Sequence, residues 1–162
     1  MDIYRFFDAH GIAYDRHDHP AVFTCEEADR LVPPLPAAKT KNIFLCDRKG
    51  QRHFLVVVGY EKRVDLRALS ERLDVRKLRL ASPQRLKKYL GLDPGSVTLL
   101  GVLNDPNGAV EVIVDEDLWA AETFQCHPLV NTSTVVISRG DIQRIMDITG
   151  HRVCVRRVPG MA

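Results

Sequence analysis

The sequence lacks several features that would assign it to a broad class of protein. It has no run of about 18 apolar residues, which excludes a membrane-spanning helix. Its first residues, MDIYRFFDAHG, carry acidic side chains and interrupt their apolar stretch early, unlike a signal peptide. The four cysteines, Cys25, Cys46, Cys126 and Cys154, show neither a C-x-x-C pair nor zinc-ligand spacing. We therefore expect reduced thiols in a cytoplasmic protein.

Common catalytic signatures are also missing. There is no G-x-S-x-G elbow, no glycine-rich phosphate loop and no H-E-x-x-H motif. Asp15, His17 and His19 would share one face of a strand. Three ligands on one short strand rarely converge on one ion, so we expect no metal and no cofactor. Cys126 and His127 are adjacent and would point to opposite faces of a strand, which argues against a Cys–His nucleophile pair.

Net charge is small, but the charges are unevenly distributed. The 162 residues are 45% hydrophobic and 27% charged, with a net charge of +2, as in an ordinary globular domain. Residues 62–88 contain ten Lys and Arg against three acids, whereas residues 89–138 contain seven acids and no Lys or Arg. This split suggests that one face meets a polyanion. Alternatively, the basic stretch is the solvated side of two helices.

Capping residues, glycines and prolines divide the chain into short elements. Helices are predicted to follow the N-caps Asp2, Thr24, Asp65, Ser82 and either Ser138 or Asp141. Strands are predicted over 12–19, 41–46, 53–60, 97–103, 109–114, 134–137 and 151–158, with hairpin turns at DRKG and DPNG. The pattern predicts a single α+β domain over residues 1–162, with a mixed, mostly antiparallel sheet and short helices packed around it.

Four segments are less generic than the rest: HPAVFTCEEA at 19–28, KTKNIFL at 39–45, PGSVTLLGVLND at 94–105 and HPLVNTSTVVIS at 127–138. In these motifs, their order and their spacing, the chain resembles the bacterial prolyl-tRNA editing family. That family shares its YbaK-like fold with the editing domain inserted in bacterial prolyl-tRNA synthetases. The resemblance covers nearly the whole chain and is closest to the freestanding proteins that hydrolyse alanyl-tRNA(Pro).

The resemblance implies roles for particular residues. Lys41 matches the family's essential lysine and Asn42 the asparagine after it, so both are expected to be catalytic. Lys39 matches no fixed position. Leu99 stands where the family loop usually has proline, which leaves the preferred amino acid open. Substrate binding is expected from residues of the other three segments: Phe23, Thr24, Gly95, Ser96, Val97, Thr98, His127, Pro128, Asn131 and Thr132.

The implied reaction is hydrolysis, in trans, of the ester in mischarged tRNA(Pro), with alanine as the expected amino acid. Such an ester is already activated, so holding it beside a water and stabilising the oxyanion with backbone N–H groups could supply most of the rate. No general base is evident, and the resemblance suggests that the vicinal ribose hydroxyl assists. We do not assign His127 as the base. A pocket too small for proline would spare the cognate product.

The implied partners are the acceptor end of tRNA(Pro) and, as a further candidate, prolyl-tRNA synthetase, with the protein itself a monomer and no membrane involved. Candidate tRNA contacts in the basic stretch are Lys62, Arg63, Arg85, Lys87 and Lys88. Three alternatives stay open: an editor of another small residue such as serine or threonine, a catalytically inactive tRNA- or synthetase-binding module of the same fold, and a small-molecule-binding domain with accidental motif matches.

Overall fold

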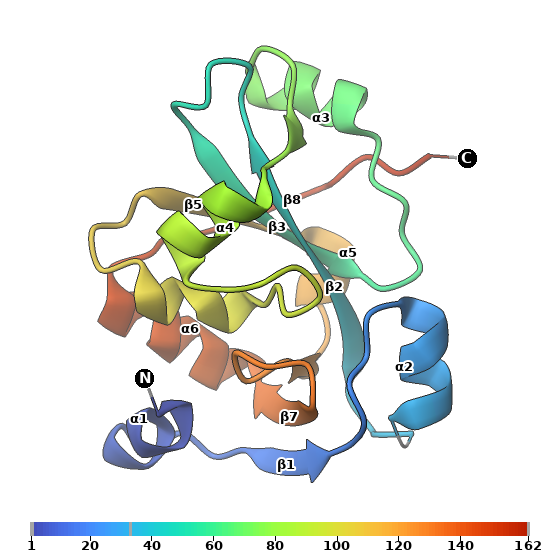
Figure 1. The fold of residues 1–162 in the computed structure, drawn as a ribbon, viewed down its shortest axis with the longest axis vertical. Coiled ribbons are helices and arrows are strands. Elements are labelled where there is room, and N and C mark those ends of the chain that lie inside the picture. Colours follow the sequence, from blue (N-terminus) through green and yellow to red (C-terminus); the bar gives the residue numbers. More distant parts are fainter. Residues whose placement is uncertain (1, 33, 162) are drawn as a thin grey trace.

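A computed structural model describes residues 2–32 and 34–161. Within these residues a mixed sheet runs in the order β1-β7-β6-β2-β3-β5-β8, with β4 paired to the outer part of β2 (Figure 1). Four of the seven strand pairings are antiparallel and three are parallel, so the predicted fold class is confirmed. The strands are β1 (Asp15–Asp18), β2 (Ala38–Cys46), β3 (His53–Gly59), β4 (Arg79–Leu80), β5 (Val110–Asp115), β6 (Thr123–Cys126), β7 (Ser133–Ser138) and β8 (Val153–Arg156).

Short helices cover the sheet, and their N-caps confirm the predicted starts. Asp2, Thr24, Asp65, Ser82 and Ser138 each accept a backbone N–H from the first turn that follows. The predicted stop of the second helix at Pro33 lies outside the described residues. The helices are α1 (Ile3–Ala9), α2 (Cys25–Leu31), α3 (Leu66–Leu73), α4 (Pro83–Leu90), the 3₁₀ helix η1 (Leu99–Asn104), α5 (Glu116–Trp119) and α6 (Arg139–Thr149). Within the described part of the chain, no helix is long and apolar enough to cross a membrane.

The strand predicted over 97–103, and with it the second hairpin, is wrong. Residues 99–104 form η1, and Thr98 caps it by accepting the N–H of Leu100 at 3.3 Å. The side chains from Leu99 to Leu103 are all buried, and a short apolar run buried on every side carries no period that separates strand from helix. Strands β4 and β6 and helix α5, which have two, four and four residues, were not predicted.

Strand β2 connects two parts of the sheet. It pairs with β3 from Thr40 to Cys46, and this is the hairpin that the sequence predicts. On its other edge it pairs in parallel with β6 at only two positions, Ala38 and Lys39. The strands then separate, so β2 continues upward with β3 while β6 turns back into β7 (Figure 1). We call this divergence the fork.

A buried ion pair helps to hold the C-terminal segment in place. Lys62 Nζ lies 2.6 Å from Asp115 Oδ2, whose side chain is only 1% exposed. The same ammonium donates to Val158 O at 2.9 Å, and Asp115 Oδ1 accepts the N–H of Val158 at 3.1 Å. Lys62, a candidate tRNA contact in the sequence, therefore has a structural part in the fold.

Replacing Lys62 with methionine should lower the free energy of unfolding by about 3 kcal/mol, because it leaves the Asp115 carboxylate buried without a counter-ion. Arg63→Met is the matched control: its side chain is exposed, and its loss should change stability by no more than about 0.5 kcal/mol. Urea denaturation measures both. Equal losses for the two variants would contradict the structural part assigned to Lys62.

Candidate active site

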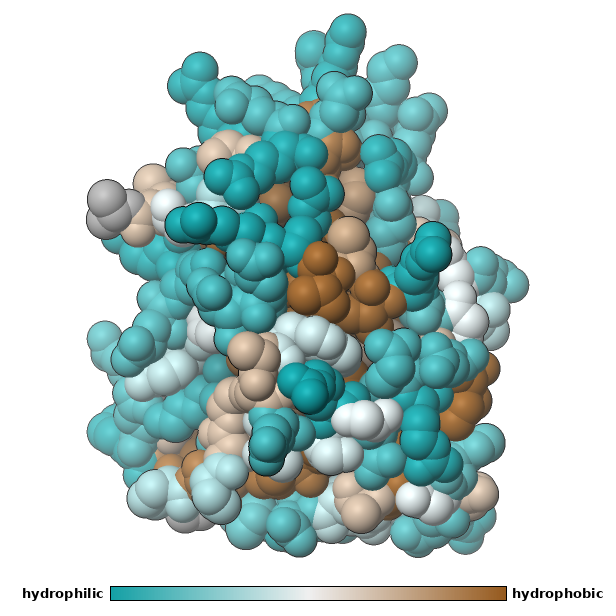
Figure 2. All heavy atoms as spheres, turned by 180° about the vertical axis from the view of Figure 1, so that it is seen from behind, coloured by the Kyte–Doolittle hydropathy of each residue, from teal (hydrophilic) through white to brown (hydrophobic). Residues whose placement is uncertain are grey.

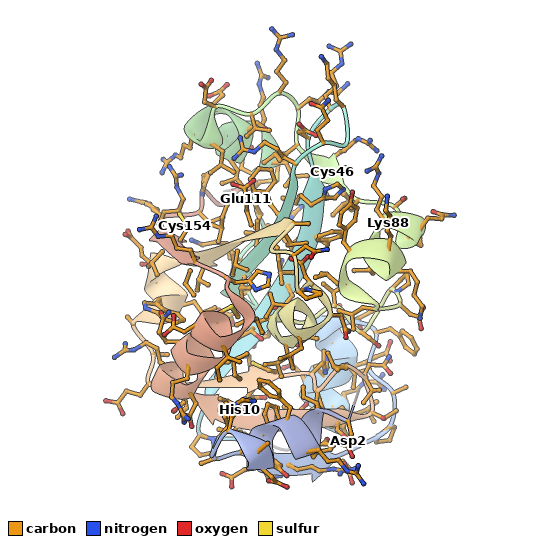
Figure 3. All side chains as sticks on the ribbon, turned by 90° about the vertical axis from the view of Figure 1, so that its left-hand side faces the viewer. Asp2, His10, Cys46, Lys88, Glu111 and Cys154 are labelled. Carbon is orange, nitrogen blue, oxygen red and sulfur yellow. The ribbon has the colours of Figure 1, made fainter. Side chains whose placement is uncertain are left out.

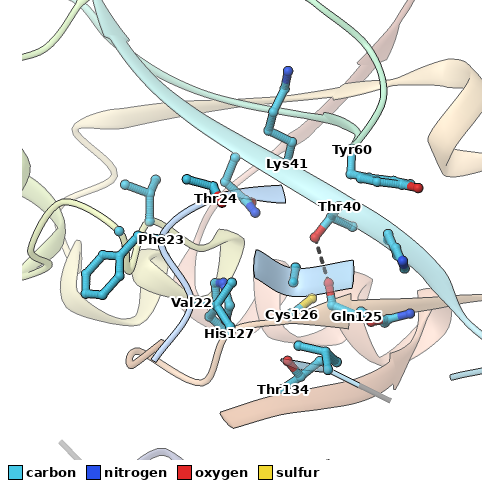
Figure 4. Close-up of a pocket in the computed structure, with 16 residues that line it drawn as sticks. Val22, Phe23, Thr24, Thr40, Lys41, Tyr60, Gln125, Cys126, His127 and Thr134 are labelled. Atoms are coloured by element: carbon cyan, nitrogen blue, oxygen red, sulfur yellow. Dashed lines mark hydrogen bonds between the residues drawn. The ribbon is translucent and has the colours of Figure 1, made fainter. Parts of the chain in front are cut away.

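A pocket of about 400 Å³ lies in the fork, beside the stretch of β2 that begins at Lys39 (Figure 4). Its walls come from segments that are distant in sequence: the loop before α2, α2 itself, β2, the loop before η1, and β6 with β7. The four motifs singled out in the sequence therefore meet around one cavity. Its lining residues are Val22, Phe23, Thr24, Ala28, Val32, Lys39, Thr40, Lys41, Asn42, Tyr60, Gly95, Val97, Gln125, Cys126, His127 and Thr134.

Side-chain hydrogen bonds fix the base of the fork. Thr40 Oγ1 donates to Gln125 O at 2.6 Å, directly after the last paired position of β2 and β6 (Figure 4). Gln125 Nε2 donates in turn to Ala37 O at 3.0 Å, on the other side of that short ladder. These two bonds hold the strands together at one end, so that the backbone of β2 can leave β6 immediately beyond Thr40.

The two lysines of the KTKN segment have different surroundings. Lys39 Nζ lies 2.6 Å from Asp29 Oδ1 on α2 and 4.8 Å from the centre of the Tyr60 ring. Lys41 Nζ makes no hydrogen bond or ion pair with any residue that the structure describes. Figure 4 shows the Lys41 side chain extending away from the hydrogen bond between Thr40 and Gln125. Lys41 is thus a pocket cation whose charge the protein leaves uncompensated.

Asn42 contributes a second unsatisfied group. Its Oδ1 atom is buried and has no hydrogen-bond partner among the described residues. An unsatisfied buried carbonyl of this kind costs roughly 1–3 kcal/mol, and such groups are few in native proteins. Together with Lys41, it places an unused cation and an unused acceptor on consecutive residues of the pocket wall.

Gly95 and Phe23 form the rim of the pocket. Gly95 has φ +90°, and a Cβ at this position would lie 2.7 Å from Cδ1 of Phe23, so glycine allows the ring to sit against the loop. Phe23 is nevertheless 64% exposed. Ser96 N–H donates to Asp93 O at 3.0 Å, whereas the N–H groups of Gly95 and Val97 have no backbone acceptor among the described residues.

Asn131 and Thr132 hold the pocket together without lining it. The N–H of His19 donates to Thr132 O at 3.0 Å, and the N–H of Val22 donates to Asn131 O at 3.2 Å. Asn131 Nδ2 donates back to Val22 O at 3.1 Å. The His19 ring lies 2.8 Å from both Pro20 O and Thr134 Oγ1. The first and last motifs are thereby fastened side by side.

His127 and Cys126 form the wall opposite β2, and both are set for a neutral state. Burial lowers the pKa of His127, whose Nδ1 donates to Ser133 O at 3.3 Å. Burial raises the pKa of the Cys126 thiol to about 12, so it stays protonated and is a poor nucleophile. Among residues 2–32 and 34–161, no group of three or more His, Cys, Asp or Glu side chains could hold a metal ion.

The structure separates the predicted substrate and catalytic residues into two sets. Lys41, Asn42, Phe23, Thr24, Gly95, Val97 and His127 line the pocket. Five others stand outside its lining: Ser96, Thr98, Pro128, Asn131 and Thr132. Of these, Thr98 caps η1 and Pro128 is buried. Leu99 is 4% exposed and packs in the main core, so it does not shape the pocket directly.

Sequence reasoning missed several pocket residues. Tyr60 and Gln125 carry no signal of their own, because each reaches the site only through strand pairing. Thr40 could have been found, since it lies between the two lysines of a motif already singled out. Thr134 lies in the last motif, on the strand that the sequence does predict.

Of the five predicted tRNA contacts, two bind other residues of the fold and three are exposed. Lys62 is committed to Asp115, and Arg85 Nη1 donates to Gly50 O at 3.0 Å and lies 3.1 Å from His53 Nε2. Arg63, Lys87 and Lys88 are exposed on the surface. Lys87 lies 3.5 Å from Asp93, and Lys88 lies 5.3 Å above the Tyr89 ring.

Known proteins match the chain over this same region. A family model described as an aminoacyl-tRNA editing domain matches residues 19–145. The chain is 38% identical over 140 residues to the prolyl-tRNA editing protein ProX of Acetoanaerobium sticklandii, a match that covers 86% of the chain and 85% of that protein. It is 37% identical over 136 residues to the prolyl-tRNA synthetase associated domain-containing protein 1 of Danio rerio, covering 83% of the chain and 73% of that protein.

Solved structures share the fold. One is described as a putative trans-editing enzyme for prolyl-tRNA synthetase, with a TM-score of 0.67, 20% identity and 95% coverage of both chains. Another, a hypothetical protein, has a TM-score of 0.74 and 18% identity, covering 98% of this chain and 99% of its own. At these identities the likeness concerns the fold alone.

Thr40→Val should lower the free energy of unfolding by about 1 kcal/mol, because it removes the hydroxyl that donates to Gln125 O at the base of the fork. Thr40→Ser keeps the hydroxyl and should lose less. Urea denaturation of the two variants measures the difference. Because valine favours strands at least as well as threonine, an unchanged or more stable valine variant would show that this bond does not hold the fork.

Proposed function

The chain belongs to the aminoacyl-tRNA editing domain family and is an aminoacyl-tRNA deacylase, and from this premise we propose that it edits tRNA(Pro) in trans by hydrolysing alanyl-tRNA(Pro) while sparing prolyl-tRNA(Pro). The observation that carries the proposal is the pair of unsatisfied groups on β2. Lys41 brings an uncompensated cation and Asn42 a buried acceptor to the same wall of the pocket in the fork. The name of the Acetoanaerobium sticklandii relative, which refers to prolyl-tRNA editing, supports tRNA(Pro) as the substrate.

The reaction requires positioning and charge stabilisation rather than a protein nucleophile. Attack of water on the ester carbonyl forms a tetrahedral oxyanion, and the ribose oxygen then leaves with a proton. Lys41 would compensate the oxyanion charge, assisted by the unused N–H groups of Gly95 and Val97 across the pocket. We assign activation of the water to the neighbouring ribose hydroxyl of the substrate, because Cys126 stays protonated.

Asn42 and His127 would orient the substrate. The carboxamide oxygen of Asn42 is an acceptor suited to the α-ammonium group of the amino acid. His127 is kept neutral by burial, and because its Nδ1 donates to Ser133 O, its Nε2 faces outward as an acceptor. It would therefore accept a hydrogen bond from the substrate, and its role is positioning rather than proton abstraction.

The pocket would select the amino acid by size, because the amino acid and the terminal ribose would share its volume. About 400 Å³ is near the lower end of the range for small-molecule sites, and the terminal ribose must enter together with the amino acid. Buried walls at Cys126 and Thr134 limit the remaining space, which would accept the alanine methyl group and exclude the pyrrolidine ring. Serine is the nearest competitor, because its side chain differs from alanine by one hydroxyl.

Phe23 would bind the terminal adenine. Its ring is 64% exposed at the pocket rim, and Gly95 supports it from behind. Stacking of one base on an aromatic ring contributes roughly 1–3 kcal/mol and tolerates any base sequence. An exposed phenylalanine beside a pocket for an ester-linked ribose fits that contact.

We also propose an oligomeric state, a cellular location and a partner for the protein. We propose that the protein acts as a monomer. We place the protein in the cytoplasm, where aminoacyl-tRNAs are made and used, with docking on prolyl-tRNA synthetase as an additional arrangement. A catalytically inactive binding module of the same fold is disfavoured by Lys41 and Asn42, since unsatisfied pocket groups cost stability and serve no purpose without a substrate.

Lys41→Ala should slow single-turnover hydrolysis of alanyl-tRNA(Pro) by about 100-fold or more, because it removes the charge that stabilises the oxyanion. Lys39→Ala is the matched control on the same strand: its ammonium already pairs with Asp29, so the rate with saturating enzyme should fall far less. The assay follows loss of labelled amino acid from tRNA(Pro) charged with alanine, serine or proline.

The wild-type protein should release alanine and leave proline attached. Preference for serine would retain the chemistry and change the assigned amino acid. Hydrolysis of none of the three, or equal rates for Lys41→Ala and wild type, would overturn the proposed function.

A further inference from the structure

We propose that five exposed cations at the far end of the β2–β3 hairpin form a docking surface for the phosphates of the tRNA acceptor stem. This surface, here called the basic knob, consists of Arg48, Lys49, Arg76, Lys77 and Arg79. The inference rests on the proposed function, because it assumes that the ester-linked end of the tRNA enters the pocket in the fork.

Backbone contacts bring the two segments of the basic knob together. The N–H of Arg48, in the turn between β2 and β3, donates to Arg76 O at 2.9 Å. Arg79 on β4 is the register partner of Cys46, the last residue of β2. Nitrogen-tipped side chains project from this end of the molecule in Figure 3, and the same end is hydrophilic in Figure 2.

The five charges of the basic knob are not compensated locally. None of them has a carboxylate within ion-pair distance among residues 2–32 and 34–161. The two segments that carry these cations are residues 47–49 and 74–79. Their acids are Asp47 and Asp74, so five cations against two acids give an excess of +3. The Asp47 carboxylate already accepts the N–H groups of Gln51 at 2.8 Å and Arg52 at 3.2 Å. Clustered cations without partners repel one another, which favours binding of a polyanion.

The shape of the surface also suits a phosphate chain. A hollow of about 600 Å³ lies between α3 and the segment before β4, and its walls include Arg67, Arg76 and Lys77 as well as Glu71 and Asp74.

The distance between the pocket and the basic knob matches a tRNA end. From Asn42 to the end of β2 at Cys46 the strand advances four residues, roughly 13 Å, and Arg48 follows in the turn. A stacked nucleic-acid strand advances roughly 3.4 Å per nucleotide, so about four nucleotides span the length of this strand. With the terminal adenosine in the pocket, the basic knob would meet the beginning of the paired acceptor stem. Such phosphate contacts give affinity and register without reading base sequence.

This assignment moves the tRNA contact away from two residues that the basic stretch suggested. Lys62 is bound to the buried Asp115, and Arg85 is bound to Gly50 O. The basic knob instead uses cations with no such partner, two of which, Arg48 and Lys49, lie outside the stretch from residue 62 to residue 88.

The first test measures binding of uncharged tRNA(Pro) by fluorescence anisotropy at several salt concentrations, which needs no catalysis. Arg76→Gln/Arg79→Gln should weaken binding about tenfold near 0.15 M salt and reduce the slope of log K against log salt by about 1.5, for two lost phosphate contacts. Arg5→Gln/Arg152→Gln, which removes two exposed cations elsewhere, should do neither. Arg76→Lys/Arg79→Lys should restore both, since a phosphate contact needs only the charge.

A second test compares an alanyl ester on full-length tRNA(Pro) with the same ester on a CCA trinucleotide. The Gln double variant should lose efficiency on the tRNA through a raised half-saturating concentration and keep the wild-type rate on the trinucleotide. An unchanged salt slope, or equal losses for both substrates, would overturn the basic knob. If the basic knob binds an acidic protein and not tRNA, the salt slope of tRNA binding should be the same for the Gln double variant and the wild type. Wild-type failure on both esters, with normal tRNA binding, would instead overturn the proposed function.

Discussion

The functional architecture depends on one constraint: β2 pairs with β6 at only two positions and then leaves it. Full pairing would fill the space beside Lys41 and Asn42 with backbone, and no pairing would leave the two parts of the sheet unconnected. The hydroxyl of Thr40 and the amide of Gln125 fix the point of divergence with hydrogen bonds of 2.6 and 3.0 Å. The loops before α2 and before η1 then line the gap, and this yields a pocket with one wall formed by residues of β2.

Electrostatics divides the cations of the protein into two groups. Some are neutralised within the fold: Lys62 by Asp115, Lys39 by Asp29, and Arg52 by Glu111 at 2.8 Å. Others have no carboxylate partner among the described residues, and these include Lys41 in the pocket and the five cations of the basic knob. A protein that handles an ester on the end of a polyanion needs charge at both places, one for the developing oxyanion and one for the phosphates.

Local chemistry explains why much of the structure could be predicted from the sequence. N-caps such as Asp65 and Ser82 act within three residues of their own position, so the starts of the helices follow from short motifs. The β2–β3 hairpin follows from two apolar runs with a turn between them. The run from Leu99 to Leu103 could not be read correctly, because its burial is decided by packing against α4 and α6 and not by its own pattern.

For the candidate site, too, the sequence predicts some residues and cannot predict others. The resemblance identified Lys41, Asn42, Gly95 and His127, and the structure brings these residues to one pocket. It could not reveal Tyr60 or Gln125, which reach the pocket through strand register, nor that Asn131 acts by holding Val22. The basic knob was equally hidden, because Arg48 and Arg76 are neighbours only through a hydrogen bond between distant segments.

The most direct test of the account is a crystal structure with a non-hydrolysable 3′-alanylamido adenosine. We predict that the alanyl group lies in the fork, with its carbonyl oxygen within hydrogen-bond distance of Lys41 Nζ and its ammonium group facing Asn42 Oδ1. The adenine should stack on Phe23. Density for the analogue outside the fork, or an alanyl group without contact to β2, would contradict the account.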